Sequence, residues 1–146
     1  MKSTFLRPGL AVLGCAAALA LASPSMAAVV KMKAELKASN EVPPAKSNGT
    51  GMVEVTYDTA THMMSWNGTY SGLSGPAVAA HFHAGEMGKN GGVAVPIFSG
   101  TSAKSPFSGS KELTEAQAAQ LMSGGWYVNI HTKANKAGEI RGQVQK

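Results

Sequence analysis

The chain has 146 residues, with 13 Lys and Arg, 8 Asp and Glu, 4 His, one Cys and a formal net charge of +5. This length suits a single compact domain. The basic residues are spread along the chain rather than clustered, which excludes a nucleic-acid-binding footprint. Because Cys15 is the only cysteine, internal disulfides and multi-thiolate metal sites are excluded as well.

The N-terminal segment has the pattern of an export signal. It starts with two basic residues, continues with an apolar run and ends in small residues at Ala27. We therefore expect a signal peptide over residues 1–27 and a periplasmic or secreted domain over residues 28–146. Lipoprotein processing at Cys15 and a retained membrane anchor are alternatives, although the apolar run is shorter than the roughly 18 residues of a span.

The remainder of the chain alternates apolar and polar residues with a period of two, which is typical of strands with one buried face. Thr114 and Gln117 predict the capping box of a single helix, and Gly68 indicates a bulge in its strand. These signals predict an all-β fold, a Greek-key antiparallel β-sandwich or barrel with one short helix. We expect strands at residues 30–37, 53–57, 64–70, 77–83, 93–98, 126–131 and 138–145, an irregular edge strand at 101–109, and the helix at 114–122.

Three histidines share one position relative to the predicted core. His81 and His83 flank Phe82, so both imidazoles point away from the face on which Phe82 is buried. His131 points outward from its own strand in the same way. Imidazole nitrogens suit copper and zinc, whereas calcium and magnesium prefer oxygen. The pattern therefore predicts a metal site, with copper favoured and zinc as the alternative.

Other residues could support this site. Asn129 shares the outward face with His131, and Met87 follows His83 in a glycine-rich segment, where it could contact copper weakly or fill the loop. Arg141 could draw an anion toward the metal or solvate the sheet edge. His62 follows a turn and is expected at the surface.

Short motifs along this domain resemble the CHRD (chordin-type) domain family. The resemblance covers residues 31–146 and implies an exported or extracellular module, in a family whose bacterial members have no agreed activity. The motifs are Glu41-Val42-Pro43-Pro44, Gly72-Leu73-Ser74-Gly75, His81-Phe82-His83-Ala84-Gly85, Gly88-Lys89-Asn90-Gly91, residues 127–132 and residues 138–143.

The order of the elements is also similar to that of the copper–zinc superoxide dismutase fold. This likeness implies copper ligands at His81, His83 and His131, and an anion-guiding role for Arg141. The zinc-binding loop, the metal-bridging histidine and the cysteine pair of that fold have no counterpart in this sequence.

Three functions are compatible with these patterns. The first is an exported copper-binding module that holds or delivers the metal, and the second is a redox enzyme similar to superoxide dismutase. The third is a structural or protein-interaction module, with a protein partner or a second copy of the chain, whose histidines only fasten loops. No Ser-His-Asp or paired-carboxylate pattern is recognisable, which argues against a hydrolase.

Overall fold

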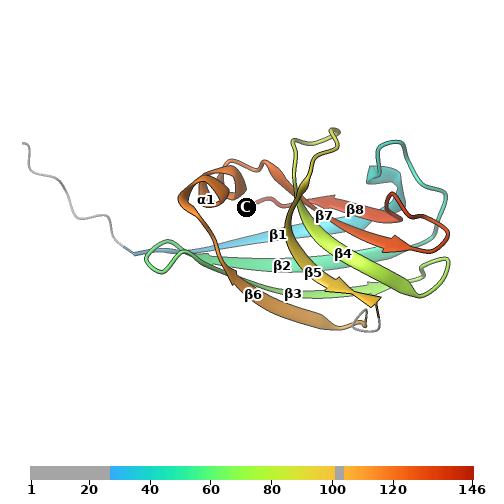
Figure 1. Ribbon diagram of the computed structural model, residues 1–146, viewed down its shortest axis with the longest axis horizontal. Helices are drawn as coiled ribbons and strands as arrows, with labels where there is room; N and C mark the ends of the chain where they lie inside the picture. Colours follow the sequence, from blue (N-terminus) through green and yellow to red (C-terminus); the bar gives the residue numbers. More distant parts are fainter. Residues whose placement is uncertain (1–26, 101–103) are drawn as a thin grey trace, which may run out of the picture.

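The computed structural model describes residues 27–100 and 104–146 (Figure 1). The expected signal peptide, apart from Ala27, therefore lies outside the described residues, as does the start of the segment predicted at 101–109. Within the described ranges, no helix has the length and hydropathy needed to cross a membrane.

The predicted strands are all found, most of them one or a few residues longer than expected. The segment predicted at 101–109 forms a regular strand further along, and the last strand is short, with four residues. The described elements are β1 (Val29–Lys37), the 3-10 helix η1 (Ala38–Asn40), β2 (Thr50–Asp58), β3 (Met63–Ser71), β4 (Ala77–Ala84), β5 (Val93–Ser99), β6 (Phe107–Glu112), α1 (Glu115–Met122), β7 (Trp126–Thr132) and β8 (Ile140–Gln143).

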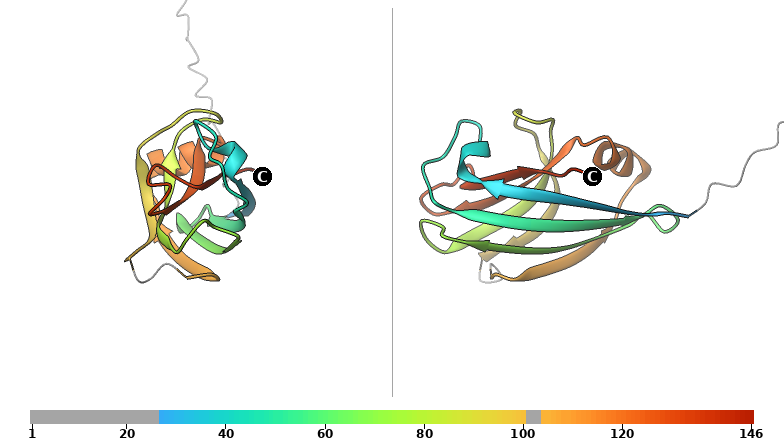
Figure 2. Two further views of the ribbon diagram at one scale, coloured as in Figure 1. Left: turned by 90° about the vertical axis from the view of Figure 1, so that its right-hand side faces the viewer. Right: turned by 180° about the vertical axis from the view of Figure 1, so that it is seen from behind.

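All eight strands belong to one antiparallel sheet in the order β5-β4-β7-β8-β1-β2-β3-β6. The β3–β4 and β6–β7 connections join strands that are not neighbours, as in a Greek key. The sheet curls on itself, so that its edge strands β5 and β6 approach each other (Figures 1 and 2). The predicted all-β Greek-key fold is confirmed, in the form of a nearly closed barrel.

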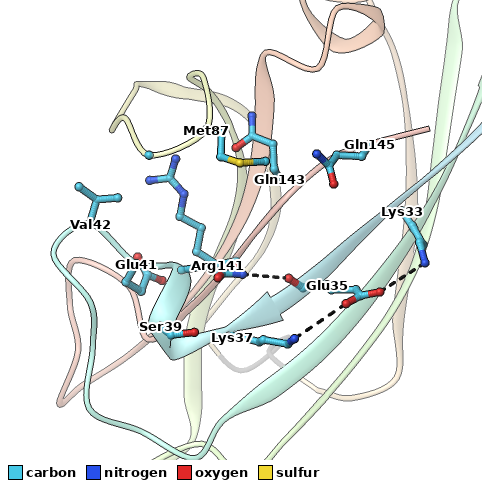
Figure 3. Close-up of a pocket in the computed structure, with 12 residues that line it drawn as sticks. Lys33, Glu35, Lys37, Ser39, Glu41, Val42, Met87, Arg141, Gln143 and Gln145 are labelled. Carbon is cyan, nitrogen blue, oxygen red and sulfur yellow. Dashed lines mark hydrogen bonds and ion pairs between the residues drawn. The ribbon is translucent and has the colours of Figure 1, made fainter.

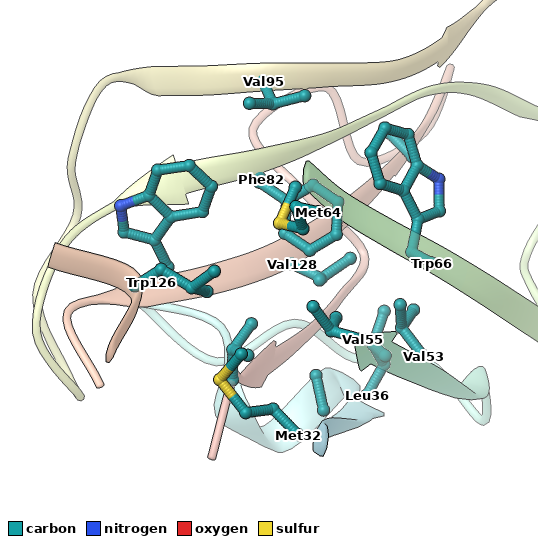
Figure 4. Close-up of a cluster of buried hydrophobic side chains, with 14 of the residues drawn as sticks. Met32, Leu36, Val53, Val55, Met64, Trp66, Phe82, Val95, Trp126 and Val128 are labelled. Atoms are coloured by element: carbon teal, nitrogen blue, oxygen red, sulfur yellow. The ribbon is translucent and has the colours of Figure 1, made fainter. Parts of the chain in front are cut away.

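The barrel interior is filled by the inward residues of every strand (Figure 4). Phe82 of β4 is completely buried there, with its ring centroid 5.3 Å from Trp66 and 6.1 Å from Trp126. Aromatic pairs at these separations contribute about 0.5–1.5 kcal/mol beyond the area they bury. Because strand residues alternate between faces, this anchor forces His81 and His83 onto the outside of the barrel.

The bulge predicted at Gly68 is wrong. The β2–β3 ladder keeps one register through this position, where Gly68 pairs with Val53. The neighbouring strand explains the glycine, since the ring of Phe107 on β6 occupies the space that a Cβ at Gly68 would need. Gly68 thus allows the Phe107 ring to approach the backbone of β3 closely.

Helix α1 lies in the long connection from β6 to β7 and confirms the predicted capping box (Figure 1). The Gln117 N–H donates to Thr114 Oγ1 at 3.3 Å, and the Thr114 N–H donates to Gln117 Oε1 at 3.0 Å. These bonds satisfy two of the donors that a helix N-terminus leaves free. Ala118 and Leu121 face the core, so that the helix packs against the barrel.

A buried carboxylate joins three loops at one end of the barrel. Glu139 is fully buried, and its oxygens accept 2.6 Å hydrogen bonds from Ser47 Oγ, from the Ser74 N–H and Oγ, and from Thr132 Oγ1. Burial raises the pKa of Glu139, but these donors outweigh it and lower the pKa from 4.5 to about 2. Glu139 therefore remains ionised and holds the loops together.

Replacing this carboxylate should destabilise the protein in a pH-dependent way. We expect Glu139→Gln to lower the free energy of unfolding at pH 7 by at least about 2 kcal/mol, because buried donors lose their acceptor. The depressed pKa gives stability that is present above pH 4.5 and is lost as the pH falls toward about 2, so the difference from wild type should shrink there. Urea denaturation at pH 7 and pH 3 measures both effects. The exposed Glu112→Gln is the control, and an equal loss at both pH values would contradict the prediction.

Candidate metal centre

The pairing of β4 with β7 brings the three outward histidines together. His81 lies opposite Asn129 and His83 lies opposite Tyr127, while Ala79 lies opposite His131. His131 is therefore the diagonal neighbour of His81 on the same face of the sheet. This register could not be read from the sequence, because the two strands are separated by more than 40 residues that include β5, β6 and α1.

The three imidazoles form one partly buried cluster. The Nδ1 atom of His81 lies 3.2 Å from Nε2 of His131, and the His83 ring centroid is 5.5 Å from that of His81. One nitrogen from each ring lies within 4.8 Å of the other two. Two nitrogens bound to one tetrahedral ion at about 2.0–2.1 Å are roughly 3.3 Å apart. The His81–His131 pair has this spacing, and the two nitrogens share a hydrogen bond.

Backbone carbonyls fix the orientation of two of these rings. His83 Nδ1 lies 2.9 Å from the Gly91 carbonyl oxygen, and His131 Nδ1 lies 2.9 Å from that of Lys136. A carbonyl only accepts, so each Nδ1 must carry the hydrogen and each Nε2 must offer a lone pair. This is the arrangement by which metal-binding histidines are usually held.

One nitrogen in the cluster lacks a hydrogen bond within the described ranges. Nε2 of His83 is buried, and no described residue is its hydrogen-bond partner. Buried polar atoms normally have a partner, and those that lack one call for an explanation such as an ion. The residues present therefore fit a metal that binds nitrogen.

The electrostatics keep the rings neutral. Burial lowers the pKa of His81, and His131 and His83 lower it further. Burial also lowers the pKa of His83, against the hydrogen bond to Gly91, and the charge of Arg141 adds to the lowering. Burial lowers the pKa of His131 in the same way, against the hydrogen bond to Lys136. Neutral imidazole is the form that binds metal, so the cluster needs to lose few protons on binding.

The face that carries the histidines is not open to solvent along β7. Tyr127 and Asn129 are each only 3% exposed, and Arg141 on β8 is 2% exposed. The Arg141 guanidinium donates to Asn90 Oδ1 at 3.0 Å and to the Lys89 carbonyl at 2.6 Å, beneath the loop of residues 85–92. Arg141 is thus packed under this loop rather than solvating the sheet edge.

The other residues expected near the site have different surroundings. Asn129 donates from Nδ2 to Oε1 of Glu41 at 2.7 Å, while its own Oδ1 is buried with no partner among the described residues. Met87 is 65% exposed at the tip of the 85–92 loop and lines a groove of about 620 Å³ beside β1 and β8 (Figure 3). His62 lies outside the cluster, with Nδ1 3.2 Å from the Tyr57 hydroxyl.

Fold and site together define an all-β Greek-key barrel with a three-histidine cluster on the outer face of its sheet. The family model for the CHRD domain matches residues 32–144, so the chain belongs to the CHRD domain family. No curated protein and no solved structure matches the chain at a significant level. The similarity to the copper–zinc superoxide dismutase fold therefore stays a prediction from the sequence.

Tyr127 and Glu41 also belong to the surroundings of the site, although neither is among the predicted site residues. Tyr127 alternates with Asn129 and His131 along β7, so strand periodicity places it on the same face as the histidines. Glu41 gave no such signal, because it follows η1 in a loop and is buried only through tertiary contacts. Burial raises the pKa of Glu41 to about 7, although the bond from Asn129 and the charge of Arg141 oppose this.

The raised pKa of Glu41 predicts a second pH effect on stability. The folded protein binds the proton more tightly than the unfolded chain does, so the contribution of Glu41 to stability is greatest below pH 4.5 and is lost as the pH rises through about 7. Glu41→Gln removes this titration, and we expect its stability relative to wild type to increase between pH 4.5 and pH 7.5. Chemical denaturation across this range measures the change, with the exposed Glu54→Gln as control. Parallel curves for wild type and Glu41→Gln would contradict the prediction.

Proposed function

We propose that this protein binds one copper ion through His81, His83 and His131 and serves to hold or deliver that metal outside the cytoplasm. The observation that carries the proposal is the buried Nε2 of His83, which has no hydrogen-bond partner in residues 27–100 and 104–146. The His83 ring belongs to a cluster of three imidazoles in which one ligand atom from each ring lies within 4.8 Å of the other two. The export signal expected over residues 1–27 supports the location.

The donor set supports copper over most other metals. It consists of three neutral imidazoles, and among the described residues no carboxylate belongs to the cluster. Calcium and magnesium require oxygen ligands, and copper exceeds the other divalent first-row metals in affinity for nitrogen sites. Zinc accepts the same donors and is the alternative.

Two other functions compete with copper binding. The bonds from His83 to Gly91 and from His131 to Lys136 also favour a structural module in which the rings only fasten loops. That role does not explain why Nε2 of His83 is buried without a hydrogen-bond partner in the described part of the chain. A redox enzyme similar to superoxide dismutase would need an arginine free to attract an anion, and the Arg141 guanidinium is already bonded beneath the 85–92 loop.

Metal titration separates these functions. We expect the metal-free protein to bind one copper ion per chain and to melt at a higher temperature when loaded, because a ligand that binds only the folded state stabilises it. His81→Ala should weaken binding by at least about a hundredfold, since even residues that only support metal ligands contribute 10–100-fold. Calorimetry and thermal melting measure the two effects, and zinc is titrated in parallel.

His62→Ala is the matched control, because His62 is a partly buried histidine outside the cluster. It should bind copper as the wild type does. Equal, weak binding by wild type and His81→Ala, with no change in melting temperature, would discard the metal site and leave the structural module. Removal of superoxide by the loaded protein would favour the enzyme.

A further inference from the structure

One side of the histidine cluster is supported by a stack of three side chains. The rings of His83 and Tyr127 are nearly parallel, at 6°, with centroids 4.9 Å apart. The Cζ atom of Arg141 lies 3.5 Å from the centroid of the same tyrosine ring. His83 and Arg141 reach this ring from β4 and β8, the two strands that flank β7 in the sheet. The Tyr127 ring therefore lies between His83, a potential metal ligand, and the permanently charged guanidinium of Arg141.

The 85–92 loop locks this stack in place. The Gly91 N–H donates to the Tyr127 hydroxyl at 3.1 Å, and the Gly91 carbonyl accepts from His83 Nδ1. Arg141 holds the other part of the loop through the carbonyls of Glu86 and Lys89. Even a methyl group at Gly91 would collide with the Ala84 carbonyl, so the close approach of this loop requires glycine. The His83 ring thus has a fixed plane as well as a fixed tautomer.

No described carboxylate belongs to the cluster itself. Glu41 interacts with the charge of Arg141 and offsets it in part, but it is also bonded to Asn129. Glu139 is enclosed by hydroxyl and amide donors. Glu86 is paired with Lys89 at 2.7 Å on the exposed loop. A metal bound at the three histidines would have neutral ligands and a guanidinium nearby. Because electrostatic repulsion grows with the charge of the ion, this environment disfavours a divalent ion about twice as strongly as a monovalent one.

We propose that Tyr127 and Arg141 are positioning residues that make the histidine cluster select monovalent over divalent copper. The proposal rests on the proposed function, since it requires that the cluster bind copper. Tyr127 holds the His83 ring so that Nε2 faces His81 and His131. Arg141 fastens the loop behind that ring and supplies the positive charge. The species held or delivered is then Cu⁺.

The test measures the dissociation constants of Cu⁺ and Cu²⁺ separately, each against a competing chelator of known affinity, and compares their ratio among variants. We expect Arg141→Gln to shift the ratio toward Cu²⁺ by about tenfold, the size of one charge acting across the Tyr127 ring in a partly buried site. Arg141→Lys keeps the charge and should restore most of the preference. The control is Lys37→Gln, which removes an exposed cation from the groove beside β1 and β8 that Arg141 also lines.

If the role of Arg141 is merely structural, Arg141→Gln weakens the binding of Cu⁺ and of Cu²⁺ equally. An unchanged ratio of the two dissociation constants in this variant would therefore overturn the proposal. If that variant does not fold, Tyr127→Leu decides, because it removes the ring through which Arg141 and His83 are aligned. It should weaken Cu⁺ binding more than Cu²⁺ binding, whereas Tyr127→Phe, which keeps the stack, should bind more like the wild type. If the wild type binds copper but the ratio of its Cu⁺ and Cu²⁺ dissociation constants is the same in every variant, this inference alone is refuted. Wild-type protein that binds neither ion refutes the proposed function as well.

Discussion

The arrangement of the site depends on the burial of Phe82. Its ring lies between Trp66 and Trp126 in the barrel interior, and this packing determines which face of β4 is the inner one. A slip by one residue would place two imidazoles in an apolar core and expose a phenyl ring, which costs several kcal/mol. The outward position of His81 and His83 is therefore a consequence of core packing rather than of any interaction between the histidines themselves.

The outer face of β7 and β8 is covered by loops, and polar contacts hold those loops in place. Glu139 joins the loops around Ser47, Ser74 and Thr132, while Arg141 holds the 85–92 loop. Burying charged groups is costly unless each is hydrogen-bonded, and both of these groups are. The same loops supply the Gly91 and Lys136 carbonyls that orient the histidine rings, so loop order and site geometry are linked.

A CHRD domain with this cluster combines a rigid sheet with donors that are ready to bind. The rings are neutral, two tautomers are fixed, and one nitrogen is buried with no partner among the residues that the structure describes. Such preorganisation lowers the entropy that binding would otherwise cost. The imidazoles are only partly buried, as the proposed holding and delivery of copper requires. These properties suit holding and transfer better than they suit a hidden structural ion.

The sequence by itself determined the strands, the single capped helix and the outward phase of His81, His83 and His131, because alternation and capping are local properties of the chain. It also contained the family motifs that the CHRD match confirms. The tertiary structure alone decided which strands are neighbours, and thus that His131 lies beside His81. It also decided that Arg141 and Glu41 are buried, and that Gly68 accommodates a ring instead of a bulge. Those outcomes depend on contacts between residues far apart in the chain, for which local periodicity carries no signal.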